Sequence, residues 1–397
     1  MSDTDTILRI AAKGDGVTAD GRHAAGAAPG DVLLPDGTLQ PGPHRATPPC
    51  RHFARCGGCQ LQHCDETALR DFVTDRVAHA AQGQGLEVGE LLPTYLSPPE
   101  SRRRATLHGL RTHKFMLGFR EGRSHRLVDI AECPVMRPEL FAMVAPLRKL
   151  LGPMAGRNPV DVALTLTDQG IDCLLTGIEL DGLGPTEAVL DFARDRGLAR
   201  LTLDLGYGAE TMWEPEPVTI TLSGVAVPFP AAGFLQPTAD GEAMLVADAV
   251  EFLEGSKVVA DLFAGLGTFA FALAPQAQTV AVEAARDAHL ACKLAAGRSR
   301  LPIESVHRDL FRNPLQPDEL ARFDAVLLDP PRAGAREQVA TIAASSVERV
   351  AYVSCNPSSW ARDAKTLVEA GFRLEKLRPV GQFRWSTHVE LTSLFSR

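Results

Sequence analysis

The second half of the chain constrains the fold most, because short apolar runs alternate there with helix-like stretches. An apolar strand without polar alternation is buried on both faces, and such strands joined by helices form a parallel sheet covered on both sides. We therefore predict an open, doubly wound α/β domain of the Rossmann-like class over residues 233–397. The expected strand and helix pairs are 258–263 with 269–273, 279–283 with 286–296, 325–329 with 336–344, and 350–355 with 358–370.

The first half of the chain shows a different residue pattern. Residues 161–166, 172–175 and 218–222 are β-rich, and 102–130 is typical of strands joined by glycine turns, which predicts a central mixed β domain over 46–232. Residues 14–49 are rich in Gly, Pro and Ala with only short β-like pieces. We expect a reduced β-module over 1–45, too small to bury much by itself.

Composition places the chain among ordinary globular proteins, with 45% hydrophobic and 23% charged residues over 397 positions. It contains no long apolar run free of charge, and its N-terminus lacks a basic segment followed by an apolar one. We therefore expect a cytoplasmic protein with neither a membrane span nor a secretory signal, and we expect a monomer.

Clustered cysteines indicate a metal site, since eight cysteines in a chain of this length are too few for a disulfide scaffold. Three of them lie within ten residues: Cys50, Cys56 and Cys59. Structural zinc and iron–sulfur cubanes both take four protein ligands, so a fourth is needed. Cys64 and Cys133 are both candidates, and the spacing alone leaves zinc and a [4Fe–4S] cluster open.

A glycine loop follows the first strand of the α/β half. That strand carries Asp261, the loop carries Gly265 and Gly267, and the next strand ends in Glu283. Glycines let a ligand approach the backbone at the carboxyl edge of an open α/β sheet, and an acid on the next strand commonly accepts ribose hydroxyls. This order predicts a nucleotide-type ligand and leaves a dinucleotide and S-adenosylmethionine both open.

Two later strands also end in side chains that could bind a ligand or act in catalysis. Asp329 opens an Asp-Pro-Pro-Arg loop, stiffened by its prolines, which can hold a planar base. Cys355 lies between Ser354 and Asn356 at a strand end. It is either a nucleophile or a thiol packed in the core. Glu390 starts the last predicted strand and is a candidate base.

Together these motifs resemble the RNA uracil-5-methyltransferase family, whose members form 5-methyluridine in ribosomal and transfer RNA. The motifs are Cys-Gly-Gly-Cys-Gln-Leu-Gln-His at 56–63, Gly-Phe-Arg at 118–120 with Ser-His at 124–125, Ala-Glu-Cys-Pro at 131–134, Phe-Leu-Gln at 234–236, Asp-Leu-Phe-Ala-Gly at 261–265, Asp-Pro-Pro-Arg-Ala-Gly at 329–334, Ser-Cys-Asn-Pro at 354–357 and His-Val-Glu at 388–390.

The resemblance implies an RNA (uracil-C5-)-methyltransferase with Cys355 as nucleophile and Glu390 as base. It implies a [4Fe–4S] cluster on Cys50, Cys56, Cys59 and Cys133. It implies S-adenosylmethionine as methyl donor, contacted at Gln236, Asp261, Gly265, Glu283, Asp309 and Asp329. The expected substrate is large-subunit (23S) ribosomal RNA, with transfer RNA as the alternative. Larger members carry a complete N-terminal TRAM barrel, which this chain retains only in reduced form.

RNA binding needs cations, although the whole chain has a net charge of −8. Residues 101–126 form a basic island with a local charge of +7, in which Glu121 is the one acid. We expect the island to contact phosphates, the main source of sequence-independent affinity. Its basic residues are Arg102, Arg103, Arg104, Arg111, Lys114, Arg120, Arg123 and Arg126.

Two other functions fit parts of the pattern. Asp-Pro-Pro sequences also serve methylation of amino groups, on another base or on a protein amide, but such a reaction needs no covalent nucleophile such as Cys355. A cluster-sensing RNA-binding protein with a vestigial methyltransferase domain would have no use for both Cys355 and Glu390.

Overall fold

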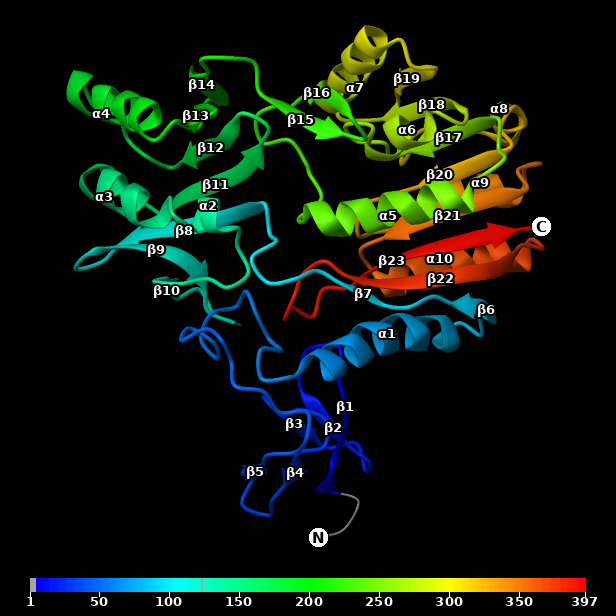
Figure 1. Cartoon of the computed structure of the whole chain (residues 1–397), viewed down its shortest axis with the longest axis horizontal. Helices are drawn as coiled ribbons and strands as arrows, with labels where there is room; N and C mark the ends of the chain where they lie inside the picture. The colour runs from blue at the N-terminus through cyan, green and yellow to red at the C-terminus, as the bar shows by residue number, and fades with distance from the viewer. Residues whose placement is uncertain (1–4, 123, 157) are drawn as a thin grey trace. The chain divides into compact units, whose positions relative to one another are not determined.

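The computed structural model describes residues 5–122, 124–156 and 158–397, and the chain groups into two compact units (Figure 1). Unit 1 comprises Met1–Val73, Ser97–Glu216 and Phe383–Thr387. Unit 2 comprises Thr74–Leu96, Pro217–Gln382 and His388–Arg397. Unit 2 thus starts its main span before the predicted boundary at 233 and includes a stretch assigned above to the central domain. The division into three domains stays a prediction.

A nine-stranded sheet forms the centre of unit 2, in the order β19-β18-β17-β20-β21-β23-β22-β6, with β7 beside β22. The first five are parallel, whereas β23 is antiparallel to both its neighbours. The strands are β19 (Ile303–His307), β18 (Gln278–Glu283), β17 (Val258–Leu262), β20 (Ala325–Leu328), β21 (Arg349–Ser354), β23 (Glu390–Ser396), β22 (Arg373–Gly381), β6 (Val88–Leu91) and β7 (Tyr95–Leu96).

Helices cover this sheet on both faces, so the doubly wound α/β prediction is confirmed. On one face, Leu245 of α5 and Phe269 of α6 join the strand residues Val259 and Leu327 in one buried cluster. The opposite face packs on α10, where the Tyr352 hydroxyl donates to Asp363 over 2.8 Å. The helices are α5 (Ala239–Phe252), α6 (Thr268–Leu273), α7 (Arg286–Ser299), α8 (Pro317–Leu320), α9 (Arg336–Ala343) and α10 (Pro357–Glu369).

The loop from β17 into α6 is one place where glycine is required. Gly265 and Gly267 have φ of 55° and 89°, in the left-handed region that side chains disfavour. A Cβ on Gly267 would also lie 2.8 Å from the Cys292 sulfur. The predicted glycine loop is therefore a tight turn that starts α6 at the carboxyl end of β17.

Unit 1 is built on a seven-stranded mixed sheet, in the order β10-β9-β8-β11-β12-β13-β14, which includes one parallel pair, β12 with β13. Its buried apolar cluster spans the sheet and three helices. The elements are β8 (Arg104–Arg111), β9 (Phe115–Arg120), β10 (Leu127–Asp129), α2 (Pro138–Phe141), α3 (Val144–Met154), β11 (Val160–Thr167), β12 (Gly170–Thr176), α4 (Leu183–Asp195), β13 (Arg200–Asp204) and β14 (Ala209–Trp213). Residues 219–222, predicted beside these strands, instead form β15 (Thr219–Leu222), paired with β16 (Val225–Pro228) in unit 2.

The N-terminal residues form two small sheets, tied together by one buried acid. Asp31 is fully buried, accepts backbone N–H groups of Ala28 and Gly42 at 2.7 Å each, and pairs with Arg45. A buried carboxylate needs such partners, and here they add to a small buried apolar cluster around Ile7 in holding the segment together. The strands are β1 (Ile7–Ile10), β2 (Gly16–Thr18), β3 (His23–Ala24), β4 (Val32–Leu33) and β5 (Leu39–Gln40).

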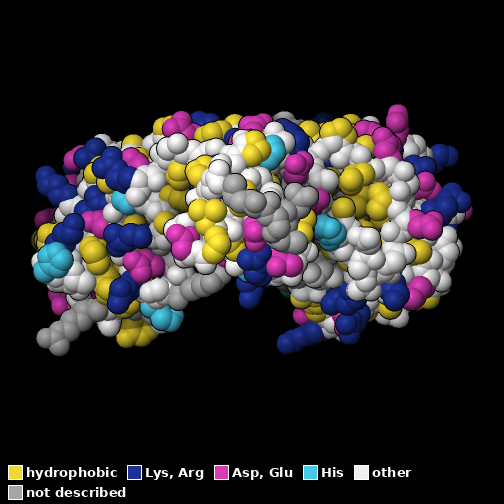
Figure 2. Space-filling model, turned by 90° about the horizontal axis from the view of Figure 1, so that it is seen from below, with side chains coloured by type: hydrophobic (Ala, Val, Ile, Leu, Met, Phe, Trp, Pro, Cys, Tyr) yellow, Lys and Arg dark blue, Asp and Glu magenta, His cyan; other side chains and the backbone are white. Residues whose placement is uncertain are grey.

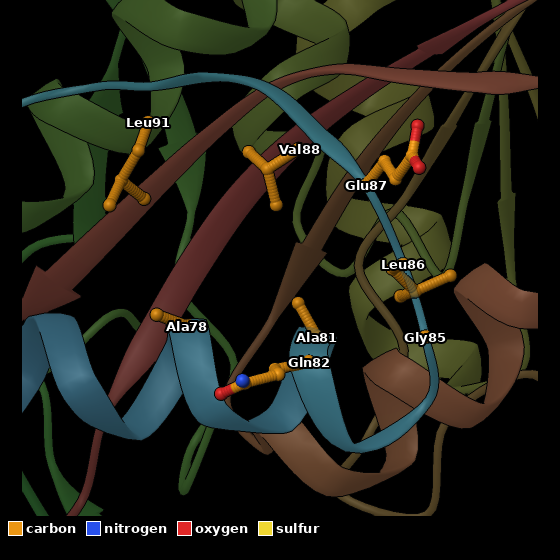
Figure 3. A pocket seen from close by; sticks show the side chains of 8 residues that line it. All are labelled: Ala78, Ala81, Gln82, Gly85, Leu86, Glu87, Val88 and Leu91. Atoms are coloured by element: carbon orange, nitrogen blue, oxygen red, sulfur yellow. The ribbon is translucent and has the colours of Figure 1, made fainter.

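Helix α1 (Glu66–Gly83) begins in unit 1 and ends in unit 2. Its last turns and β6 line a mainly apolar pocket of about 500 Å³ (Figure 3). Within the described residues, no helix combines the length and apolar character needed to cross a bilayer.

Candidate active site

The carboxyl ends of β17, β18, β20 and β21 surround a cavity of about 610 Å³ in unit 2. Open α/β sheets bind ligands at this edge. Six of the eight residues predicted there line the cavity: Gln236, Gly265, Glu283, Asp329, Cys355 and Glu390. Asp261 and Asp309 lie outside its lining.

Glu283 ties two strand ends together. Its carboxylate accepts the backbone N–H of Gly265 over 2.8 Å and that of Ala285 over 2.6 Å. A carboxylate has about four acceptor positions, so two stay available for a ligand. The acid at the end of β18 therefore holds the glycine loop in place and still presents oxygen to the cavity.

Asp261 is fully buried within β17, and neither carboxylate oxygen has a hydrogen-bond partner among the described residues. Burial raises its pKa to about 8, with the nearby charges of Asp329 and Glu283 adding to the effect and the Ala270 backbone opposing it in part. A buried acid without a partner is costly, and a cationic ligand group nearby would relieve that cost.

Asp309 shapes a loop instead of facing the cavity. Its carboxylate accepts the backbone N–H groups of Phe311 at 3.0 Å and Arg312 at 3.3 Å, a turn-stabilising arrangement. Leu310 and Phe311, which this turn positions, do line the cavity. A direct contact of Asp309 with S-adenosylmethionine stays a prediction.

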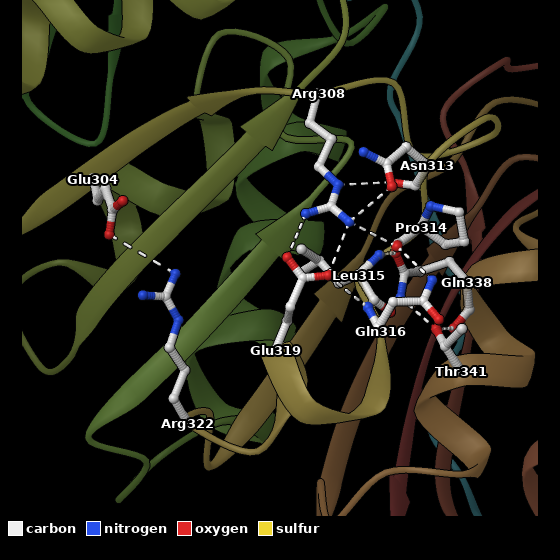
Figure 4. A network of polar contacts seen from close by, with 10 residues as sticks. All are labelled: Glu304, Arg308, Asn313, Pro314, Leu315, Gln316, Glu319, Arg322, Gln338 and Thr341. Atoms are coloured by element: carbon white, nitrogen blue, oxygen red, sulfur yellow. Dashed lines mark hydrogen bonds and ion pairs between the residues drawn. The ribbon is translucent and has the colours of Figure 1, made fainter.

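Arg308 fixes the other side of that loop (Figure 4). Its guanidinium donates to the carbonyls of Asn313 and Pro314 at 2.7 and 2.8 Å and forms two bonds to Glu319, at 2.6 and 2.9 Å. Hydrogen bonding by Arg308 lowers the pKa of Glu319 to about 2. The wall of the cavity beyond β19 is thus held by one arginine that the motif analysis did not select.

The nucleophile and base candidates meet through strand register. In the β21–β23 pair Ser354 lies opposite Leu391, so Cys355 and Glu390 extend that pairing by one position. Cys355 directly precedes Asn356, whose side chain caps α10 by accepting the Ser358 N–H over 3.1 Å. The antiparallel strand β23 therefore brings a C-terminal residue to the carboxyl edge of a parallel sheet.

Gln382, which the motif analysis missed, organises the base. Its buried amide nitrogen donates to the Glu390 carboxylate and also to the Gln236 carbonyl oxygen, the latter over 3.2 Å. Gln236 in turn donates to Asp329 over 3.5 Å. The sequence signal for Gln382 is its place as a polar residue directly after the apolar end of β22.

Acidic groups in this cavity raise one another's pKa. Burial raises the pKa of Asp329 to about 7 and that of Glu390 to about 8, and Asp329 contributes to the second shift while Gln382 opposes it. Burial, followed by Glu390 and Asp329, raises the pKa of Cys355 to about 11, with Arg332 opposing. A cavity with this charge balance favours a cationic ligand, whose charge would lower all of these pKa values.

A second cavity, of about 260 Å³, lies in unit 1 and is lined by four cysteines: Cys50, Cys56, Cys59 and Cys133. Cys64 is buried elsewhere and does not line it. The segments that carry these thiols are fastened to each other, since His52 accepts the Ala131 N–H over 2.9 Å and Arg51 pairs with Glu132.

The four cysteines border one cavity, where burial changes the pKa of the Cys59 thiol. Burial raises the pKa of Cys59 to about 12, and Cys133, Cys56 and Cys50 add to that shift while Gln62 opposes it. In the part of the chain that the structure describes, no three His, Cys, Asp or Glu side chains are arranged to hold a metal ion directly. The cavity is therefore a pocket bordered by thiols.

The basic island is only partly exposed, which corrects the expectation for its first members. Arg103 is 8% exposed and Arg102 is half-buried, with its guanidinium 5.2 Å from the centre of the Phe383 ring. Figure 2 shows basic and acidic side chains interspersed on the face it presents. Arg123 lies outside the described residues. The exposed members are Arg111, Lys114, Arg120 and Arg126.

Comparisons with known proteins place this geometry in a family. An uncharacterized RNA methyltransferase of Zymomonas mobilis is 49% identical, over 98% of this chain and 99% of the relative. A 23S rRNA (uracil(1939)-C(5))-methyltransferase of Pectobacterium atrosepticum is 33% identical, over 90% of this chain and 81% of the relative. The chain belongs to the RNA uracil-5-methyltransferase family. This confirms the resemblance and the assignment as an RNA methyltransferase.

The other comparisons agree with this membership. The tRNA (uracil-5-)-methyltransferase family model matches residues 308–397, which carry Asp329, Cys355 and Glu390. The crystal structure of Pyrococcus abyssi tRNA (uracil-54, C5)-methyltransferase, in complex with S-adenosyl-L-homocysteine, superimposes with a TM-score of 0.75. The match covers 98% of this chain and 99% of the Pyrococcus chain at 21% identity, and it supports the fold described above for this chain.

Proposed function

We propose that this enzyme transfers a methyl group from S-adenosylmethionine to carbon 5 of a uridine in large-subunit ribosomal RNA. The observation that carries the proposal is the placement of Cys355, Glu390 and Asp329 around one cavity at the carboxyl edge of the sheet. A reaction at an amino group would need no thiol there. The relative from Pectobacterium favours ribosomal RNA, and the family model keeps transfer RNA as the alternative.

The cavity fits S-adenosylmethionine as cosubstrate. The Gly265 turn lets a ligand approach the backbone, and Glu283 offers acceptor positions for ribose hydroxyls. The sulfonium and ammonium groups of the methyl donor are cations, which suits a cavity where burial and then a neighbouring acid raise the pKa of Asp329 and Glu390. Gln236 and the partnerless Asp261 lie at the remaining places where the family resemblance predicts contacts.

The chemistry follows from these residues. Cys355 gives up its proton to solvent, and the thiolate adds to carbon 6 of uracil, which forms an enolate with a nucleophilic carbon 5. Carbon 5 then attacks the methyl carbon, the bond from methyl to sulfonium sulfur breaks, and a neutral thioether leaves. Glu390 takes the proton from carbon 5, and the bond from carbon 6 to Cys355 breaks to release the 5-methyluridine. Asp329 orients the ring, and the uridine must be flipped out of its stack to reach it.

We propose that Cys50, Cys56, Cys59 and Cys133 hold a [4Fe–4S] cluster. A cubane takes four cysteine ligands, each on a separate iron atom, and the four cysteines here line one cavity. The cluster would cross-link the segments 50–59 and 131–134. Each thiol must lose its proton on binding. The positive charge of the iron would then lower the pKa of Cys59, which burial raises.

The test of the substrate is direct. The purified enzyme is incubated with methyl-labelled S-adenosylmethionine and either 23S ribosomal RNA or transfer RNA from cells that lack the enzyme. Mass spectrometry of the digested nucleosides should detect 5-methyluridine in the 23S sample. Label in transfer RNA alone would establish the alternative substrate, and label in another nucleoside would overturn the C5 reaction.

The pH dependence of cosubstrate binding checks the acidic cavity. Because the pKa values of Asp329 and Glu390 are raised to about 7 and 8, these carboxyls gain negative charge as the pH rises through that range. We expect the affinity for S-adenosylmethionine to increase about tenfold between about pH 6 and pH 9, by one-proton linkage. The product S-adenosylhomocysteine lacks the sulfonium, so its affinity should increase much less over the same pH range. Titration calorimetry of both ligands measures the difference, and parallel curves would contradict the prediction.

The exposed part of the basic island should set the salt dependence of RNA binding. Replacing Arg120 and Arg126 by Gln is expected to weaken binding and to reduce the slope of log affinity against log salt by about 1.4–1.8, the contribution of two phosphate contacts. Arg194→Gln, on the exposed face of α4 in the same unit, is the control. Filter binding at several salt concentrations gives the slope, and an unchanged slope would leave these two arginines as solvated surface.

A further inference from the structure

Five of the eight residues that connect the last two strands of the chain form a segment that we call the strap. The strap is Phe383–Thr387 and lies between β22 and β23. It groups with unit 1, whereas the chain on either side of it groups with unit 2. Gln382 directly precedes the strap, and Glu390 follows it by three residues. The strap therefore sets the path of the chain between the base and the amide that donates to it.

The strap is held by the residues that follow the Cys-Gly-Gly-Cys motif. The Trp385 carbonyl accepts two backbone N–H groups, from Gln60 over 2.7 Å and from Leu61 over 2.9 Å. Trp385 has a φ of 61°, which is uncommon for a bulky side chain. Its side chain is 8% exposed, so the centre of the strap is buried.

The Gln60 side chain makes a second link. Its amide nitrogen donates to the Gly57 carbonyl over 2.7 Å, and its amide oxygen accepts the Thr387 N–H over 3.3 Å. One side chain thus uses its donor on the cysteine loop and its acceptor on the strap. Glutamine is the residue that can do both at this position, since a carboxylate would offer no proton to the Gly57 carbonyl.

Two arginine contacts fasten the rest of the strap. The Arg102 guanidinium, which borders the cysteine cavity, lies 5.2 Å from the centre of the Phe383 ring. Arg384 donates to the Ser97 carbonyl over 3.1 Å and pairs with Glu66, also at 3.1 Å. Every anchor of the strap described here belongs to unit 1.

We propose that Gln60 is a positioning residue for the removal of the carbon-5 proton, acting through the strap on Gln382 and Glu390. The inference rests on the proposed role of Glu390 as base. Gln382 and Glu390 lie at the two ends of the turn that joins the strands, since Gln382 directly follows β22 and Glu390, to which it donates, starts β23 opposite Val380. A loosened strap displaces the carboxylate from the proton, and misplacement by about 1 Å costs on the order of a hundredfold in rate.

The test compares Gln60→Ala with Gln60→Glu. Gln60→Ala removes the two side-chain hydrogen bonds and leaves the backbone bonds to Trp385, and we expect turnover to fall about ten- to a hundredfold while the dissociation constant for S-adenosylmethionine is unchanged. Because Cys355 is intact, the slow step becomes proton removal, and a covalent protein–RNA adduct should accumulate on a denaturing gel. Gln60→Glu keeps the oxygen that accepts from Thr387 and should lose less turnover. Gln84→Ala, in the exposed turn after α1, is the control.

The adduct separates this role from a structural one. If Gln60→Ala loses turnover only by weaker RNA binding, with no adduct, the inference is wrong. Full turnover by Gln60→Ala also overturns it. Should Gln60→Ala fail to fold, Gln60→Glu decides, since its partial loss must likewise be accompanied by adduct. If the Glu390→Gln protein also forms no adduct, the proposed function fails, and the inference fails with it.

Discussion

The Glu390→Gln protein is expected to methylate its RNA once and then to remain attached to it through Cys355. The amide keeps the size of the side chain but cannot accept the carbon-5 proton, and loss of a general base costs about 10²–10⁴-fold in rate. The measurement is a denaturing gel with labelled RNA, on which the adduct migrates slowly. The buried position of Glu390 beside Gln382 makes replacement of the base by solvent inefficient.

Cys355→Ala supplies the matched comparison. Without the thiol, carbon 5 is not activated, so this variant should bind RNA and S-adenosylmethionine yet transfer no methyl group. The double variant Cys355→Ala,Glu390→Gln should show no slow band. Turnover by Cys355→Ala would overturn the covalent mechanism, whereas turnover by Glu390→Gln would keep the nucleophile and assign the base to another residue.

Cys133→Ala is expected to lose the iron of the anaerobically purified protein, which should hold about four irons per chain by the ligand argument. Cys133 lines the thiol-bordered cavity, and a cubane with three remaining protein ligands is poorly retained. Iron assay and the visible absorption of the brown protein measure the loss. Chelator should also lower the melting temperature of the wild-type protein, because metal binding stabilises the folded segments that it joins.

Cys64→Ala is the control for this experiment. Cys64 is buried close to Cys59 in sequence but away from the cavity, so its substitution should leave the iron content unchanged. Loss of iron from Cys64→Ala with retention in Cys133→Ala would show that Cys64, and not Cys133, is the fourth ligand. A colourless protein with stoichiometric zinc would contradict the cluster itself.

The sequence by itself determined the α/β class and the places where the chemistry lies. Apolar strands such as β20 and β21 are buried on both faces, and their residue types carry that information locally. A parallel sheet brings the carboxyl ends of its strands to one edge, so Asp329, Cys355 and Glu283 could be assigned to one site without coordinates. The motifs identified the family for the same reason, since each is a short run of neighbours in the chain.

Only the tertiary structure decided how these local pieces meet. Burial of Arg102 and Arg103 could not be predicted, because a run of arginines has the same composition on a surface as beneath a neighbouring segment. The position of Cys133, and not Cys64, on the wall of the thiol-bordered cavity depends on the path of the chain over dozens of residues. The strap contacts, which join Gln60 to Thr387, link positions more than three hundred residues apart. Sequence patterns report the environment of a residue's neighbours, whereas contacts of this kind arise from packing, which the pattern does not encode.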